Sequence, residues 1–387
     1  MRELRSPRAQ VVLAVLFLLT LALTGCGSGS SSFGGGTPPP PPPAPEFLFA
    51  AANNTVITFS VDTSSGELAQ NSYVAGNHGG FGIIANPANK FLYTDDTVND
   101  GIDAFSIGSA GALTAINGSP FPMPSGWSAF GVDNLAIDPA GKFLYSPDGT
   151  SNSIAGFTID GTSGALAPIP GSPFPTGIAP VQVVVHSSGK FLYVSDSNDP
   201  QAGISAFTID SSTGALTPIT VSPFGSGVNA YGLAMDSSGK FLFAVEPLVS
   251  EISAFTIDSS TGILTPVAGS PFSIGGNFNF VIAWSITISP SGQFLYALGS
   301  VDGGIFAFNI DPNSGALTPN AGSPFNIEIV AYMSAMSFDP SGKFLYVGID
   351  TGSMEAMSVD ETTGALTVDR AMTTFAYGPS MAIIQQK

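Results

Sequence analysis

The sequence has few basic residues and few residues that carry covalent or metal chemistry. Only 10 Lys and Arg stand against 28 Asp and Glu, so the formal net charge is −18. Nucleic acid is therefore not an expected partner, because phosphate binding requires clustered Lys and Arg. Two histidines leave few candidates for general-base catalysis, and a single cysteine excludes an intramolecular disulfide.

Hydrophobic and turn-forming residues, in contrast, are abundant. Hydrophobic residues make up 44% of the chain, which also contains 46 Gly and 31 Pro. No segment after residue 25 has the hydrophobic period of a helix. This composition predicts an all-β domain with many turns and a large core.

The first 25 residues have the features of a signal peptide. Three arginines are followed by an apolar run from Val11 to Leu23, which is too short to span a bilayer comfortably. The run ends in Leu-Thr-Gly-Cys, which resembles the bacterial lipobox and predicts acylation of Cys26. An ordinary signal peptide with a chance cysteine is the alternative. We expect an extracytoplasmic, lipid-anchored protein, in the outer membrane if the cell is Gram-negative, because Gly27 rather than Asp follows the cysteine.

Residues 26–46 combine the predicted lipidated cysteine with a linker rich in Gly, Ser and Pro. Such a composition cannot bury enough apolar surface to offset the entropy of ordering. The six prolines from Pro38 to Pro43 predict a stiff extended spacer. The globular domain is expected to occupy residues 47–387.

One unit of about 50 residues recurs along this domain. Each copy has a Pro-Ser-Gly type of turn, a Phe-Leu-Tyr strand, a strand of the Ile-Ser-Ala-Phe-Thr-Ile type and a third of the Gly-Ala-Leu-Thr-Pro type. The Phe-Leu-Tyr or Phe-Leu-Phe elements begin at Phe47, Phe91, Phe143, Phe191, Phe241, Phe294 and Phe344. A Gly-Ser-Pro-Phe element that follows several copies is interpreted as a structural connection.

These strands are apolar on both faces, as expected for sheets that are buried on both sides. Sheets stacked radially as propeller blades meet that condition. The first unit lacks its inner strand, and Ser380–Ile384 supplies a strand without a unit of its own. We therefore predict a seven-bladed β-propeller of four-stranded antiparallel blades, closed by pairing of the C-terminal strand with the N-terminal blade.

With these repeats, residues 47–387 resemble the lactonase-like seven-bladed propellers, which include the 6-phosphogluconolactonase-type proteins and related YVTN repeats. The resemblance implies lactone hydrolysis. Enzymes of the family carry Pro-Arg-His at the start of one inner strand, then a His-Pro-Asn-Gly-Lys turn and an acidic residue beyond the second strand.

This sequence departs from the pattern at the Arg and His positions, nine and eight residues before the turn lysine or its equivalent. The first position holds Phe81, Asp133, Val181, Tyr231, Trp284 and Ser334, and the second holds Gly82, Asn134, Gln182, Gly232, Ser285 and Ala335. His186 matches the second family histidine but occupies a turn, so we interpret it as structural. The remaining catalytic candidates are His78, in a Gly-rich loop, and Glu246, within one residue of the family's acidic position.

The connections after the Phe-Leu-Tyr strands vary between units and are acidic. Asp95, Asp96, Asp196 and Asp199 are candidate ligands for calcium or another hard cation, which prefers oxygen donors. A solvated acidic rim without bound metal is the alternative, and no cofactor is otherwise expected.

A second candidate surface lies near the starts of the inner strands. There, aromatic rings and neutral or acidic polar groups could line a channel mouth that suits a neutral glycan or a peptide. These candidate binding residues are Asp133, Asn134, Gln182, Tyr231 and Trp284. Packing of the aromatic rings between blades is the alternative. We expect a monomeric binding module for a glycan or an envelope protein, with a lactone hydrolase as the competing hypothesis.

Overall fold

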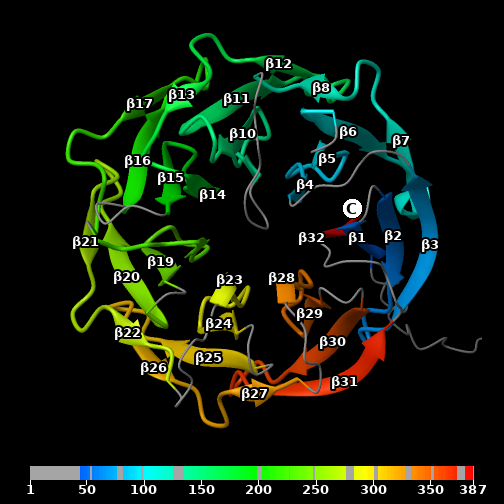
Figure 1. The fold of residues 1–387 in the computed structure, drawn as a ribbon. Helices are drawn as coiled ribbons and strands as arrows, with labels where there is room; N and C mark the ends of the chain where they lie inside the picture. Colours follow the sequence, from blue (N-terminus) through cyan, green and yellow to red (C-terminus); the bar gives the residue numbers. More distant parts are fainter. Residues whose placement is uncertain are drawn as a thin grey trace, which may run out of the picture. The chain divides into compact units, whose positions relative to one another are not determined.

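A computed structural model describes most of the domain that the repeats define. The described residues are 44–52, 55–75, 82–96, 99–124, 135–197, 203–225, 227–246, 249–275, 283–299, 304–327, 333–349, 353–372 and 380–386. They form seven antiparallel sheets, which are the blades of a ring (Figure 1). The seven-bladed β-propeller predicted from the repeats is thus confirmed. We number the blades by the order of their second strands in the chain.

In every blade the strands follow one another from the centre of the ring outward. The innermost strands are β4 (Ile83–Ala85), β9 (Ala136–Ile137), β14 (Pro180–Val185), β18 (Gly232–Met235), β23 (Ala283–Ile288), β28 (Met333–Phe338) and β32 (Ser380–Gln385). The second strands are β1 (Glu46–Ala52), β5 (Phe91–Asp96), β10 (Phe143–Asp148), β15 (Phe191–Asp196), β19 (Phe241–Glu246), β24 (Phe294–Gly299) and β29 (Phe344–Ile349). Strand β1 begins one residue before the predicted start of the domain.

The third and fourth strands complete the blades. The third strands are β2 (Thr55–Val61), β6 (Gly101–Ile107), β11 (Ser153–Ile159), β16 (Ile204–Ile209), β20 (Glu251–Ile257), β25 (Gly304–Ile310) and β30 (Ser353–Val359). The fourth are β3 (Leu68–Ala75), β7 (Leu113–Ala115), β12 (Leu166–Pro168), β17 (Leu216–Pro218), β21 (Leu264–Pro266), β26 (Leu317–Pro319) and β31 (Leu366–Met372). A 3₁₀ turn, η1 (Ser109–Gly111), precedes β7.

The serine of the Gly-Ser-Pro-Phe element bonds to the third strand of its own blade. In blade 4, the Ser222 hydroxyl accepts the N–H of Ala206 at 2.8 Å. The equivalent bond recurs in blades 2, 3, 5 and 6. In these four blades the residues that follow form a short strand beside the third strand: β8 (Phe121–Pro122), β13 (Phe174–Pro175), β22 (Phe272–Ser273) and β27 (Phe325–Asn326). The element thus replaces part of the outer ladder, which agrees with its structural interpretation.

The ring closes through pairing of the two ends of the domain. Strand β32 lies antiparallel to β1, with Glu46 opposite Gln385 and Ala51 opposite Ser380. Beyond the strand, the N–H of Gln386 donates to the carbonyl oxygen of Pro45 at 2.9 Å. Blade 1 therefore contains three strands from the start of the domain and one from its end, as predicted.

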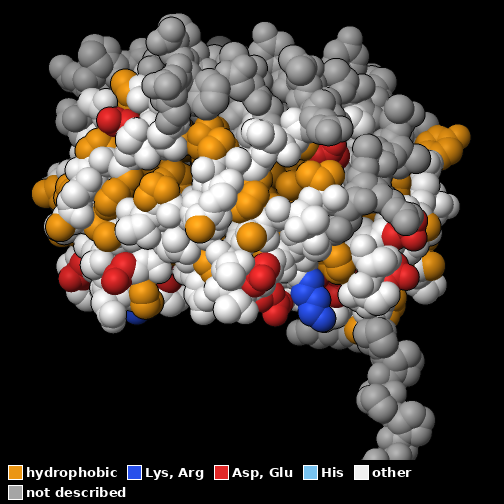
Figure 2. All heavy atoms as spheres, turned by 90° about the horizontal axis from the view of Figure 1, so that it is seen from below, with side chains coloured by type: hydrophobic (Ala, Val, Ile, Leu, Met, Phe, Trp, Pro, Cys, Tyr) orange, Lys and Arg blue, Asp and Glu red, His pale blue; other side chains and the backbone are white. Residues whose placement is uncertain are grey.

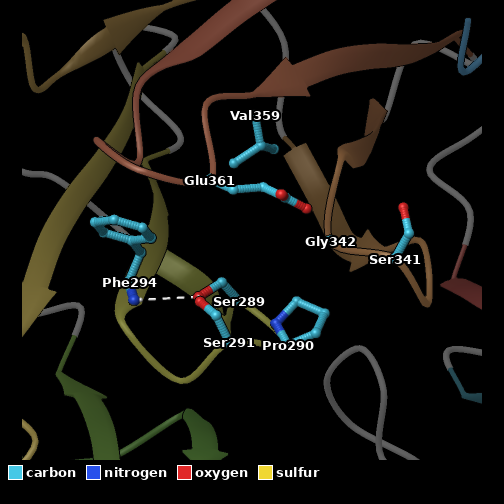
Figure 3. A pocket seen from close by; sticks show the side chains of 8 residues that line it. All are labelled: Ser289, Pro290, Ser291, Phe294, Ser341, Gly342, Val359 and Glu361. Carbon is cyan, nitrogen blue, oxygen red and sulfur yellow. Dashed lines mark hydrogen bonds between the residues drawn. The ribbon is translucent and has the colours of Figure 1, made fainter.

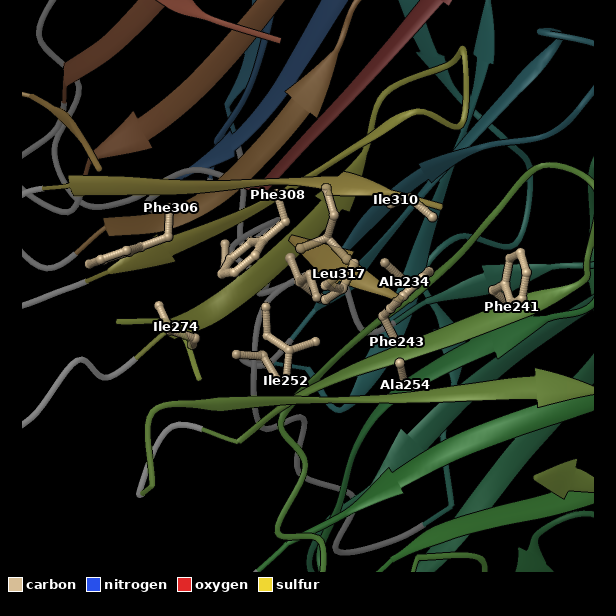
Figure 4. Packing of buried hydrophobic residues seen from close by; sticks show 14 of the residues in the cluster. Ala234, Phe241, Phe243, Ile252, Ala254, Ile274, Phe306, Phe308, Ile310 and Leu317 are labelled. Atoms are coloured by element: carbon tan, nitrogen blue, oxygen red, sulfur yellow. The ribbon is translucent and has the colours of Figure 1, made fainter. Parts of the chain in front are cut away.

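Apolar side chains fill the spaces between neighbouring blades. Figure 4 shows the layer between blades 5 and 6, where Phe243 and Ile252 face Phe306 and Phe308. These four side chains are between 0% and 4% exposed. Full burial of such a side chain stabilises the fold by about 1.5–3 kcal/mol, so the stacked layers can hold the ring together without disulfides.

The tight turns gather on one face of the ring, which we call the turn face. In most blades, the turn that follows the third strand begins with an aspartate. Asp210, for example, accepts the N–H groups of Ser212 and Thr213, both at 2.9 Å. Gly214 then takes a φ of 75°, a conformation that glycine adopts without strain. Viewed from the side, the ring has acidic side chains along its lower rim (Figure 2).

Candidate functional site

Those acidic candidates that the structure describes lie where the second strands end, on the face opposite the turns. We call this the loop end of the blades. Four consecutive second strands finish there with a buried carboxylate, since the last residues of β5, β10, β15 and β19 are 1–6% exposed. They are Asp96, Asp148, Asp196 and Glu246. Each blade repeats its strand in the same register, which places these carboxylates at equivalent positions.

The carboxylate of Asp196 is enclosed by hydroxyl groups. Ser205 on β16 donates to Asp196 Oδ2 at 2.5 Å, and Thr176 donates to Oδ1 at 3.3 Å. The backbone of Gly177 passes so close that a Cβ there would overlap the carboxylate. Burial raises the pKa of Asp196 to about 6, although the hydroxyl hydrogen bonds lower it in part.

Glu246 has a similar environment in the next blade. Its side chain is 6% exposed, and Ser253 on β20 donates to Oε1 at 2.5 Å. Burial raises its pKa, and the nearby charge of Glu251 adds to the rise. Two adjacent blades thus contain a carboxyl group whose burial favours the protonated acid, while the serine hydroxyl bonded to it favours the ionised form.

The other acidic residues at these strand ends accept hydrogen bonds from nearby backbone and side-chain groups. Asp95 is 0% exposed and accepts the N–H of Gly82 at 2.8 Å. Asp96 accepts from the backbone and side chain of Asn99. Asp148 accepts from the backbone and hydroxyl of Ser151. The bonds of Asp96 and Asp148 order the start of each loop by the side-chain-to-backbone pattern that aspartate favours in turns, whereas Asp95 joins its strand to the residue before β4.

Gln182 and Tyr231 lie where blades 4 and 5 meet. The Gln182 side-chain oxygen accepts the N–H of Leu233 on β18 at 2.6 Å. Ser195 donates to the carbonyl oxygen of Tyr231 at 2.9 Å. The Gln182 side chain therefore links the inner strands of two blades, in addition to any role at the channel mouth.

Several predicted site residues fall outside the described part of the chain. These are Cys26, His78, Asp133, Asn134 and Asp199; the backbone of Trp284 lies in β23, but its side chain is not described. His186 is described, and it has a structural position in its turn. Its Nε2 contacts the Gly239 carbonyl oxygen at 2.8 Å, and its Nδ1 accepts the N–H of Ser188 at 3.0 Å. A neutral imidazole with its proton on Nε2 satisfies both contacts.

Ser205 and Ser253 were not identified from the sequence as site residues, although both contact the candidate carboxylates. They occupy the second position of the Ile-Ser-Ala-Phe strand, where blades 2 and 7 carry Asp103 and Glu355. These two carboxylates are also buried, at 1% and 3% exposure. The sequence does contain a signal for these residues. Four blades carry a hydrophilic residue at this strand position, whereas the other blades carry an apolar one.

The described residues contain no group of three or more His, Cys, Asp or Glu side chains placed to hold a metal ion. In the same part of the chain, no helix has the length and apolar character needed to cross a bilayer.

Comparison with known proteins identifies the family. The sequence model described as "Lactonase, 7-bladed beta-propeller" matches residues 167–282 and 274–380, which together span more than half of the chain. The chain therefore belongs to the lactonase family of seven-bladed propellers. No curated protein matches the sequence.

Solved structures with the same fold have low sequence identity to this chain. A protein from Lactobacillus plantarum is 19% identical with a TM-score of 0.73, over 88% of this chain and 99% of that one. A putative 6-phosphogluconolactonase from Bacteroides fragilis is 21% identical, with a TM-score of 0.67 over 88% and 98%. A periplasmic gluconolactonase from Pseudomonas aeruginosa is 15% identical, with a TM-score of 0.67 over 88% and 99%. Identities this low establish the shared fold only.

Proposed function

We propose that this propeller is a lipid-anchored binding module of the cell envelope, which presents the loop end of its blades to a neutral glycan or a protein partner. The supporting observation is the identity of the residues at the positions that match the family's Arg and His. In blade 4 they hold Val181, which is 5% exposed, and Gln182, which bonds to the neighbouring blade. In blade 5 they hold Tyr231 and Gly232. None of these side chains supplies the cationic group that would stabilise a developing oxyanion.

An assay of lactone hydrolysis tests this proposal. We expect the full chain to hydrolyse 6-phosphogluconolactone and gluconolactone no faster than the spontaneous reaction. Calcium, magnesium and manganese should be added and then chelated, because a bound cation can polarise a carbonyl in place of a basic side chain. Cation-dependent turnover would instead make the acidic loop end an active site.

A glycan and envelope-protein binding screen tests the other half of the proposal. Tyr231→Ala should weaken binding of a hit while leaving the melting temperature near that of the parent. His186→Asn is a matched control, because His186 lies in a turn and Asn86 fills the equivalent turn position in blade 2. Equal affinity of the parent and Tyr231→Ala would place the binding surface elsewhere.

Lactone hydrolysis is the second candidate function, and one observation favours it besides the family. The pKa of Asp196 is raised to about 6, near the value that suits a general base at neutral pH. If Asp196 acts in this way, Asp196→Asn abolishes turnover, and the rate of the parent rises with pH through that pKa. Glu246→Gln offers the same test in the next blade.

The lipid anchor is the proposed means of localisation. Cys26→Ser should release the protein from the membrane fraction into the soluble fraction, because one thiol carries the acyl group and the sequence contains no other. Metabolic labelling with a fatty acid should mark the parent and not the variant. Unchanged membrane retention of the variant would contradict this mode of anchoring.

A further inference from the structure

The turn face contains a cavity between blades 6 and 7. Its volume is about 450 Å³, and it is lined by the turn before β24, the turn before β29 and the turn after β30 (Figure 3). Pro290, Phe294 and Val359 give it apolar walls, and Ser291 adds a hydroxyl group. The side chain of Glu361 extends across it from the turn after β30 (Figure 3).

The preceding junction, between blades 5 and 6, shows what this place in the fold can bind. There the Nζ of Lys240 donates to the carbonyl oxygens of Pro312 at 3.1 Å and Asn313 at 2.7 Å. The same Nζ lies 4.7 Å from the centre of the Phe241 ring. A primary ammonium group is therefore held by two carbonyls of the next blade's turn and by an aromatic ring.

The junction between blades 6 and 7 lacks this lysine. The residue at the position of Lys240 is Gln293, and the residue at the position of Pro312 is Glu361. The aromatic residue is retained as Phe294, so this junction keeps the ring, loses the cation and gains a carboxylate in the turn after β30. In the sequence, the other turns of this kind carry Lys90, Lys142, Lys190, Lys240 and Lys343.

We propose that this cavity binds a small ligand that carries a primary ammonium group, and that amino sugars are the class that fits it. The ammonium group would bind the Glu361 carboxylate, which extends from the turn equivalent to the one that accepts the Lys240 ammonium at the preceding junction. A hydrogen bond to a charged partner is roughly twice as strong as a neutral one, so Glu361 favours an amine over an alcohol. The Pro290 ring offers a surface for the C–H face of a sugar, and Ser291 offers a hydroxyl partner.

This site is separate from the proposed function, because it lies on the face opposite the loop end. Its ligand can bind whether or not the loop end binds a glycan or hydrolyses a lactone. A negative result at one face therefore leaves the proposal for the other face unaffected.

Calorimetric titration of the full chain at low ionic strength tests the proposal. We expect glucosamine to bind with a dissociation constant of about 1 mM or tighter, and glucose, which has a hydroxyl in place of the amine, to bind at least tenfold more weakly. Equal binding of the two sugars, or no binding of glucosamine, would overturn the proposal. Tighter binding of Nα-acetyl-lysine amide than of glucosamine would overturn the amino-sugar assignment and favour a lysine side chain of a protein partner.

Three variants locate the site. Glu361→Gln should weaken glucosamine binding at least tenfold, because it removes the carboxylate from an exposed turn residue without changing its size. Gln293→Lys should abolish binding, because it restores the lysine found at the preceding junction. Lys190→Gln, two junctions away, is the control and should leave the affinity unchanged. Melting temperatures close to the parent's verify folding, and full affinity in Glu361→Gln would rule out the cavity as the site.

Discussion

At the scale of single residues, the loop end contains carboxylates whose ionisation works against folding. Asp196 is 1% exposed, and burial raises its pKa to about 6, well above the usual value of an aspartate. Asp210 on the turn face behaves in the opposite way, because hydrogen bonds from Ser212 and Thr213 lower its pKa to about 2. The same residue type therefore stabilises the fold at one face and opposes it at the other.

Asp196→Asn should flatten the pH dependence of stability. Because the folded pKa is raised, the contribution of Asp196 to stability is fully present below pH 4 and is lost as the pH rises through 6. At pH 8 the variant should be more stable than the parent by on the order of 2 kcal/mol, since an ionised group no longer has to be buried. Chemical unfolding between pH 4 and 8 measures this difference.

Asp210→Asn is the matched comparison for that prediction. Its folded pKa is lowered, so the stability that it contributes is present above about pH 4 and is lost as the pH falls through 2. The variant should therefore lose stability at neutral pH and little at strongly acidic pH. A parallel pH profile for the parent and Asp196→Asn would contradict the raised pKa.

Single side-chain contacts are also what the sequence predicts least well. The aspartates at the strand ends can be recognised as acidic loop residues, because their identities are visible in the repeat. The hydroxyl partner of Asp196 cannot be, because Ser205 belongs to another strand and the register between strands decides which side chains meet. His186, in contrast, could be interpreted as structural, since a turn position is a local property.

At the scale of strands and turns, a tyrosine in five of the seven blades bonds to a turn glycine of the next blade. The Tyr193 hydroxyl on β15 donates to the carbonyl oxygen of Gly262, in the turn of blade 5, at 2.9 Å. Phe191 packs under the same glycine so closely that a Cβ there would overlap the ring. Equivalent tyrosine bonds recur at four other junctions, from Tyr93, Tyr145, Tyr296 and Tyr346. The recurrence of tyrosine and glycine in the repeat thus reflects contacts between blades as well as within them.

Tyr193→Phe should destabilise the domain by about 1–2 kcal/mol, because it leaves the buried Gly262 carbonyl without its donor. Blade 5 offers the converse test, since it carries Phe243 at the equivalent position, next to the turn that contains Gly315. Phe243→Tyr should place a hydroxyl opposite the Gly315 carbonyl and restore the bond. Denaturant unfolding of both variants checks the pair, and no change on Tyr193→Phe would mean that the hydroxyl bond contributes nothing net.

The strands and turns themselves were predictable because each unit repeats the same local signals. Alternation of turn glycines with strands apolar on both faces indicated stacked sheets, and the first and last segments indicated how the ring closes. Contacts between blades are harder to predict. The sequence of one repeat indicates which strands pair within its own blade, but it does not indicate which side chains of the next blade lie opposite. The cavity beside Glu361 illustrates this limit, because residues of two different units, such as Phe294 and Glu361, line it together.

At the scale of the whole molecule, one long-range pairing closes the ring. The first and last strands are joined in a single sheet, and Gln385 donates to Glu46 at 2.9 Å across the closure. Apolar residues of β32 also belong to the hydrophobic core, since Met381 is 5% exposed and Ile384 is 3% exposed. They belong to two different clusters, one shared with blade 7 and one shared with blade 2.

Deletion of residues 380–387 should therefore abolish cooperative folding and cause aggregation. The deletion removes the hydrogen-bond partners of β1 along its inner edge and leaves an open, apolar edge strand, which pairs readily with other chains. Deletion of Lys387 alone is the control and should leave the melting temperature unchanged, because the described strand ends at Gln385. Adding the deleted segment back as a peptide tests the cause directly, since it should restore folding if the missing strand is responsible. A truncated protein that melts like the parent, with no response to the peptide, would show that the ring does not depend on this closure.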